Sequence, residues 1–98
     1  MSQLTVELRT EYDRTVVEVV GELDLSTVQE LADAFERADR SGGRTLVLDA
    51  SGLTFCDSAG LRVLMEARHR GAIALRSPSD GLRRLLELTG TADRFEVI

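Results

Sequence analysis

The residue best suited to chemistry in this sequence is a serine next to a carboxylate. Ser58 follows Asp57 within the stretch Phe55–Leu61, where a predicted strand gives way to a predicted helix. The apolar residues that follow, beginning with Leu61 and Leu64, recur at helical spacing. We therefore expect Ser58 to be the N-cap residue, near the surface and at the positive end of the helix.

Two interpretations of Ser58 need no second residue. As a plain cap, it would stabilise the helix by about 1 kcal/mol and do nothing more. As a phosphorylation site, it would gain roughly −1.5 to −2 charge and three acceptor oxygens. A helix N-terminus can hold a phosphate, but the neighbouring Asp57 opposes it. The main effect would then be repulsion and desolvation against whatever docks on this surface.

A third interpretation makes Ser58 a nucleophile, which requires a base. The strand–turn–helix context is similar to a nucleophile elbow, but Cys56 stands at the first glycine of G-x-S-x-G. The only histidine, His69, lies further along the same predicted helix, roughly 16 Å away by helical rise. A Ser–His pair within one subunit therefore fails on geometry. We expect His69 to stabilise the last helical turn instead.

Acidic residues follow several predicted strands. Asp24, Asp49 and Asp57 each lie at or just beyond a strand end, and such ends share one rim of a parallel sheet. Carboxylates suit Mg²⁺, but solvated acids and loop caps explain the same pattern, and we assign no metal site. Cys56 lies beside Asp57, whose charge disfavours a thiolate, so a small and largely buried thiol is expected.

The strands that carry these residues are predicted from apolar patterning. Alternation over Leu4–Arg9 predicts a half-buried strand, and the polar turn Glu11–Arg14 is short enough for a hairpin. Thr15–Glu22 has apolar residues on both faces, which predicts a central strand covered on each side. Thr45–Ala50 is a third, buried strand, followed by turn residues Ser51–Gly52.

Helix signals separate the strands. The first helix begins at Ser26 or Thr27, since both have capping-box spacing and the sequence does not choose between them. Its apolar stripe runs over Leu25–Ala38, and Ser41–Gly43 ends it. The second helix ends near Arg70–Gly71.

A third helix and two short strands complete the chain. Ser77–Asp80 opens the helix with a cap residue and a proline in the first turn, and Gly90 stops it. Strands are predicted at Ala72–Leu75 and Phe95–Ile98. This order predicts a single α/β domain over residues 1–98. Its mixed sheet begins with an antiparallel hairpin, continues mostly parallel and has helices packed against it.

Composition excludes several classes of function. The 98 residues carry a net charge of −5 with scattered basic residues, so no basic stripe for nucleic acid is present. No lysine occurs, which excludes a P-loop and a Schiff base. One cysteine fits a reducing compartment. No apolar stretch approaches the roughly 20 residues of a membrane span, and no signal peptide is visible. We expect a cytoplasmic protein.

Several segments of the chain resemble the STAS-domain anti-sigma-factor antagonists of bacteria. The segments are Gly21–Asp24, Leu48–Asp49, Phe55–Leu61, Pro78–Ser79 and Leu86–Gly90. The resemblance covers almost the whole chain in register, and its most specific part is the Asp-Ser-x-Gly-Leu motif. It implies a STAS-like fold.

The resemblance also implies regulation by partner switching. In this family the unmodified antagonist binds an anti-sigma factor that is also a serine kinase, and the sigma factor is released. The kinase, using ATP and Mg²⁺, phosphorylates the serine matching Ser58, and a PP2C-type phosphatase reverses this. The chain would thus be a substrate and not an enzyme, with no cofactor of its own, and a monomer or weak homodimer.

The resemblance implies a docking face as well. It comprises the segments Asp24–Thr27 and Asp57–Leu61 and the exposed side of the second helix. The residues assigned to partner binding or support are Asp24, Ser26, Thr27, Asp57, Ala59, Gly60, Leu61, Arg62 and Glu66. We hypothesise that Asp57 orients the loop and that Asp24 supports the site across the rim. Ala59 stands where many relatives carry a second hydroxyl, so Ser58 is the one acceptor in the motif. The alternatives are a STAS subunit of another regulatory or transport complex, a small-ligand module and, in a different class, a hydrolase.

Overall fold

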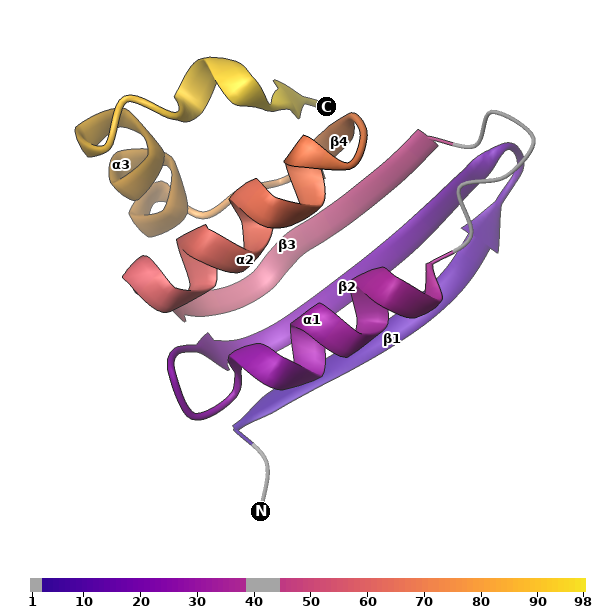
Figure 1. Ribbon diagram of the computed structural model, residues 1–98, viewed down its shortest axis with the longest axis horizontal. Helices are drawn as coiled ribbons and strands as arrows, with labels where there is room; N and C mark the ends of the chain where they lie inside the picture. Colours follow the sequence, from indigo (N-terminus) through magenta and orange to yellow (C-terminus); the bar gives the residue numbers. More distant parts are fainter. Residues whose placement is uncertain (1–2, 39–44) are drawn as a thin grey trace.

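A mixed sheet with helices organises the chain, as the computed structural model shows for residues 3–38 and 45–98 (Figure 1). The elements are β1 (Leu4–Glu11), β2 (Arg14–Leu23), α1 (Val28–Arg37), β3 (Thr45–Cys56), α2 (Ser58–His69), β4 (Ile73–Arg76), α3 (Asp80–Leu88), the 3₁₀ turn η2 (Ala92–Arg94) and β5 (Glu96–Val97). The strand order is β1-β2-β3-β4-β5. β1 and β2 are antiparallel and all other pairs are parallel, which confirms the predicted fold class.

The third strand is longer than expected. The predicted turn at Ser51–Gly52 is wrong, because β3 continues through it to Cys56. A side chain at Gly52 would lie 2.9 Å from Cγ2 of Val20 on the adjacent strand, and the β2–β3 register shifts at this point. The glycine thus marks an irregularity where two strands approach closely, and not a turn. β3 therefore leads the chain directly into α2.

All three helices pack on one face of the sheet. Their buried apolar residues form one cluster with the strand residues of that face: Val17, Val19, Leu46, Leu48 and Leu75 from strands, Leu31 and Phe35 from α1, Leu61 and Leu64 from α2, and Leu82 and Leu86 from α3. β2 lies between β1 and β3, as a central strand should. The parallel strands β2 and β3 end at the same edge of the sheet, where α1 and α2 begin, on the left of Figure 1.

The other face of the sheet carries charged side chains over a small apolar cluster of Val16, Val47 and Ala74. The guanidinium nitrogens of Arg9 lie 3.5 Å from Oε2 of Glu18 and 3.7 Å from Oδ2 of Asp49. No helix among the described residues covers this face, so the expectation that the second strand is covered on each side is wrong. Ion pairs, and not a second layer, cover the apolar groups there.

Helix boundaries differ from the predicted ones in detail. α3 is capped by Ser79, so the predicted cap at Ser77 is wrong and Pro78 precedes the helix. Gly90 follows its C-cap with a φ of +70°, as expected of a residue that ends a helix. α1 extends to Arg37, and the predicted end at Ser41–Gly43 lies outside the described residues.

Candidate functional site

The start of α2 is capped by Asp57 and not by Ser58. Asp57 has extended backbone angles, and its Oδ1 accepts hydrogen bonds from the backbone N–H of Ala59 at 2.9 Å and of Gly60 at 3.1 Å. Ser58 is the first residue inside the helix. The prediction that Ser58 is the cap is therefore wrong, because the preceding carboxylate already takes the free N–H groups.

This arrangement leaves the serine hydroxyl unused. Ser58 is exposed, and within the part of the chain that the structure describes its side chain makes no hydrogen bond or ion pair. A hydroxyl that caps a helix contributes to the stability of the fold, whereas no hydrogen bond within the described residues engages this one. It is available to another molecule.

Two residues that follow Ser58 in the helix, Gly60 and Leu61, are buried and closely packed. Gly60 is buried, and a Cβ atom there would lie 2.7 Å from Cγ of Leu23 and 2.8 Å from Sγ of Cys56. The side chain of Leu61 joins the core. The backbone N–H of Asp57 donates to the Leu23 carbonyl oxygen at 3.2 Å, which ties α2 to the end of β2. These contacts hold the serine at the edge of the sheet.

Asp24 organises the neighbouring loop between β2 and α1. Its Oδ1 accepts from the Ser26 hydroxyl at 2.6 Å and from the backbone N–H groups of Ser26 and Thr27. The hydrogen bond from the Ser26 hydroxyl, with those from the backbone, lowers the pKa of Asp24 and favours its charged form. Thr27 is the N-cap by position, but its hydroxyl donates to the Glu22 carbonyl oxygen at 2.8 Å and does not cap α1.

The loop presents an apolar side chain to solvent. Leu25 is 80% exposed, so its predicted place in the buried stripe of the first helix is wrong. It lies on one side of a groove of about 630 Å³ whose other side is α2. The groove is lined by Leu25, Val28, Asp57, Ser58, Ala59, Arg62, Val63 and Glu66. We call this the Ser58 groove.

Five predicted site residues line the Ser58 groove: Asp57, Ser58, Ala59, Arg62 and Glu66. The other predicted residues shape its surroundings, since Asp24, Ser26 and Thr27 hold the loop and Gly60 and Leu61 lie beneath. Sequence reasoning included Leu25 in a docking segment but assigned it to a buried stripe, and it did not predict the apolar lining of Leu25, Val28 and Val63. A leucine between Asp24 and the capping-box residues was the available signal.

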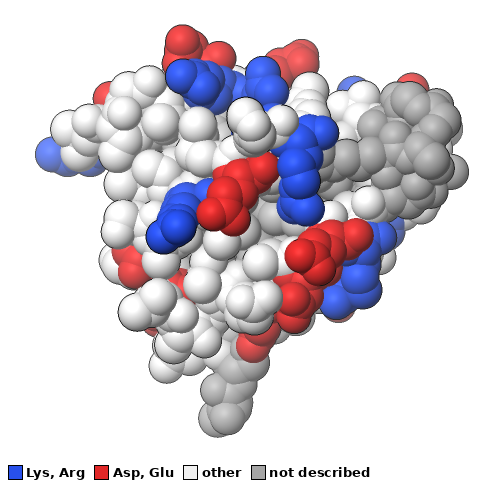
Figure 2. All heavy atoms as spheres, in the orientation of Figure 1, with Lys and Arg blue, Asp and Glu red and all other residues white. Residues whose placement is uncertain are grey.

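Charges in the groove are few and exposed. Arg62 and Glu66 form an i,i+4 pair, with 3.4 Å between Nε and Oε1 and with 82% and 64% of their side chains accessible. Figure 2 shows the side of the molecule that faces the viewer in Figure 1. Basic and acidic side chains are interspersed there, with uncharged surface between them. An apolar lining with a charged rim suits the docking of another protein.

The remaining candidate residues, Asp49 and Cys56, do not join Asp24 and Asp57 in a metal-binding or nucleophilic site. Asp49 is inside β3, where it accepts from the Ser51 backbone N–H and hydroxyl, so its predicted place on a rim with Asp24 and Asp57 is wrong. Among residues 3–38 and 45–98 no group of three or more His, Cys, Asp or Glu could hold a metal ion. Burial, with the charge of Asp57 second, raises the pKa of Cys56 to about 12, which keeps the thiol protonated.

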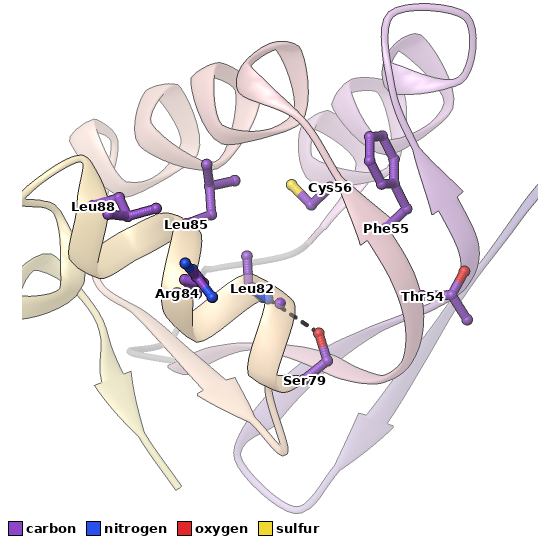
Figure 3. Close-up of a pocket in the computed structure, with 9 residues that line it drawn as sticks. Thr54, Phe55, Cys56, Ser79, Leu82, Arg84, Leu85 and Leu88 are labelled. Carbon is purple, nitrogen blue, oxygen red and sulfur yellow. Dashed lines mark hydrogen bonds between the residues drawn. The ribbon is translucent and has the colours of Figure 1, made fainter.

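A second hollow of about 300 Å³ lies on the other side of the end of β3, against α3 (Figure 3). Phe55 and Cys56 lie on one side of it, and Leu82, Leu85 and Leu88 of α3 face them. The Ser79 hydroxyl at its edge accepts from the Leu82 N–H at 3.2 Å, so this serine is already engaged.

Known proteins resemble this chain over nearly its whole length. A family model described as "Mlab, STAS domain" matches residues 6–98. The anti-sigma-B factor antagonist of Listeria monocytogenes is 29% identical over 100 residues, covering 96% of this chain and 88% of the relative. The antagonist of the same name from Staphylococcus aureus is 28% identical over 99 residues, covering 96% and 92%.

Solved structures share the fold. An anti-sigma factor antagonist from Mycobacterium paratuberculosis has a TM-score of 0.86 at 26% identity, over 96% of this chain and 84% of that one. The unphosphorylated form of the anti-sigma factor antagonist SpoIIAA has a TM-score of 0.70 at 21% identity, over 96% and 88%, a likeness of fold alone. None of the helices in the described ranges is long and apolar enough to span a bilayer.

Proposed function

This chain belongs to the STAS domain family, and from that premise we propose that it is an anti-sigma factor antagonist that works by partner switching. Unmodified, it binds an anti-sigma factor that is also a serine kinase, in the cytoplasm, and the sigma factor is released. Phosphorylation of Ser58 ends this binding, and a PP2C-type phosphatase restores it. The observation that carries the proposal is an exposed, unengaged serine hydroxyl inside an apolar groove.

In the proposed reaction this chain supplies only the acceptor. Oγ of Ser58 bonds to the γ-phosphorus of ATP held by the kinase, the bond from that phosphorus to the β–γ bridging oxygen breaks, and ADP leaves. The hydroxyl proton passes to a base of the kinase. In the reverse reaction the phosphatase uses water to release inorganic phosphate. The capped helix start holds the hydroxyl outward throughout.

The groove explains why a phosphate would weaken docking. A partner that covers Leu25, Val28 and Val63 removes water from the groove, and a phosphate there would carry roughly −1.5 to −2 charge beside Asp57. Desolvating that charge without a matching cation in the partner is costly. Asp24 contributes by holding the loop that presents Leu25.

Phosphorylation is tested by incubating the protein with its anti-sigma kinase and ATP, followed by intact-mass and peptide analysis. We expect one added phosphate, on Ser58, and none on Ser58→Ala. A kinase that binds the protein, is active on another substrate and leaves Ser58 unmodified would refute the phosphorylation switch.

Docking in the Ser58 groove is tested with two matched surface leucines. Leu25→Asp should weaken binding to the anti-sigma factor at least tenfold, because it places a charge in the apolar lining. Leu88→Asp is the control, since Leu88 is 75% exposed but lines the second hollow. Docking in this groove would be contradicted if both variants lost affinity for the anti-sigma factor equally, or if neither variant lost affinity.

A second candidate function is a STAS subunit of another regulatory or transport complex. The observation that favours it is that the family model over residues 6–98 shows the STAS domain, whereas the two anti-sigma-B factor antagonists compared are 29% and 28% identical. Purification from the native host with identification of the bound protein by mass spectrometry distinguishes the two. An anti-sigma kinase as the bound partner supports the first function, and a stable complex without a kinase supports the second.

A further inference from the structure

We propose that Arg62 is the residue that binds the phosphate on Ser58, and that it leaves Glu66 to do so. This inference rests on the proposed phosphorylation of Ser58. It adds that the docking surface itself is rearranged by the modification, and it assigns the rearrangement to one side chain of α2.

Position on the helix brings the two residues together. Ser58 and Arg62 are four residues apart on α2, which places their side chains on the same face about one turn from each other. Both line the Ser58 groove. A long arginine side chain that is 82% accessible is free to reach toward the helix start.

Two of the backbone N–H groups at the helix N-terminus are not free to receive the phosphate. The N–H groups of Ala59 and Gly60 that would bind an anion already donate to the Asp57 carboxylate. Asp57 also repels a phosphate on the adjacent residue. Across the groove the lining residues are Leu25 and Val28, which offer no charge. Of the described residues that line the groove, Arg62 is thus the one cation.

The existing partner of Arg62 holds it weakly. The distance from Nε to Glu66 Oε1 is 3.4 Å and both side chains are largely accessible, so the pair contributes little. Its order is also the less favourable one, since the basic residue precedes the acidic one along the helix. A phosphate at Ser58 reverses that order, carries more charge and offers oxygens for bidentate hydrogen bonds. The phosphate should therefore displace Glu66.

Two changes to the docking face follow. The guanidinium group moves toward the helix start along the wall of the groove, and the Glu66 carboxylate loses its partner. A partner protein that fits the unmodified groove then meets a displaced arginine and an unpaired acid as well as the phosphate. The modification acts on several lining residues at once.

The test is the second pKa of the phosphate, measured by ³¹P NMR at low ionic strength. Phosphoserine is incorporated at position 58 during translation, so no kinase is needed. In Arg62→Gln we expect this pKa to rise by about half a unit, because the cation that stabilises the dianion is lost. In Glu66→Gln we expect it to fall, because Arg62 is released from its competitor.

Arg70→Gln is the matched control, since Arg70 is exposed at the other end of α2 and its loss changes net charge equally. A rise in Arg62→Gln no larger than that in Arg70→Gln overturns the proposal. Because the kinase is not involved, a failure of the proposed function leaves this measurement intact. Conversely, a phosphate pKa that is the same in Arg62→Gln as in the parent would refute the role of Arg62 and leave the proposed function untouched.

Discussion

Two helices of this protein begin with the same three residue types in a different order. In α2 the order is Asp57, Ser58 and then Gly60, and in α3 it is Ser79, Asp80 and Gly81. The carboxylate caps α2 and the hydroxyl caps α3. One serine is therefore engaged in its own helix, and the other is left free. The difference shows that order, and not composition, decides which hydroxyl is available to a partner.

The glycines of the two helix starts differ as much as the serines do. Gly60 is buried, with no room for a Cβ atom between Leu23 and Cys56. Gly81 is exposed, and the nearest atom to a Cβ there would be Oγ of Ser79 at 3.9 Å. α2 thus begins in close contact with the end of β2, whereas α3 begins in open space. Tight packing beneath Ser58 fixes the position of its hydroxyl, which of the two serines compared is the free one.

The largest expected effect is that of Gly60→Ala. The added methyl group overlaps two core side chains, so we expect the free energy of unfolding to fall by about 2 kcal/mol despite the better helix propensity of alanine. Urea denaturation measures this. A variant as stable as the parent would show that the start of α2 is not tightly packed.

Asp57→Ala should have the next largest effect. Loss of the cap leaves the N–H groups of Ala59 and Gly60 without their partner and should cost about 1–2 kcal/mol in unfolding free energy. The control is Asp57→Asn, which keeps an acceptor oxygen and should lose less. If the two substitutions cost the same, the carboxylate charge and not the hydrogen bonds would be responsible.

The paired serines test the comparison directly. Ser79→Ala should destabilise the protein by about 1 kcal/mol, because it removes the cap of α3. Ser58→Ala should change stability by less than about 0.5 kcal/mol, as expected for an exposed site without contacts. Chemical denaturation of the two variants side by side provides the measurement. The reverse ranking would mean that Ser58 is a structural cap.

One small expected effect has the opposite sign. Gly81→Ala should raise the free energy of unfolding by about 0.5 kcal/mol, since alanine is the better helix former and the position is open. The same denaturation experiment measures it. Destabilisation by this substitution would indicate that α3 also begins in close packing.

Local pattern was enough to predict the order of elements and the mixed sheet. Periods of two and of 3.6 residues depend only on neighbours in sequence, so the strand containing Val17 and Val19 was found from sequence alone. Gly52 was misinterpreted, because its fit against Val20 depends on the adjacent strand. The sequence pattern also could not predict that one face of the sheet carries no helix of the described chain, because the choice of face depends on residues far apart in the chain.

The candidate site was predictable in its residues and not in its geometry. Asp57 and Ser58 both satisfy the local rules for a cap. The backbone N–H of Asp57 donates to the Leu23 carbonyl oxygen and so ties the helix start to β2, but Leu23 lies in a distant part of the chain. Leu25 fits a helical stripe by spacing, but hydrogen bonds to Asp24 hold the segment as a loop. The Ser58 groove exists only because that loop and α2 meet at one edge of the sheet.

The central claim is that Ser58 carries the switch. Its most direct test is the dissociation constant for the cognate anti-sigma factor, measured by titration calorimetry for unmodified protein and for protein bearing phosphoserine at position 58. We predict at least tenfold weaker binding of the phosphorylated form, or about 1.4 kcal/mol. Equal dissociation constants for the two forms would contradict the account.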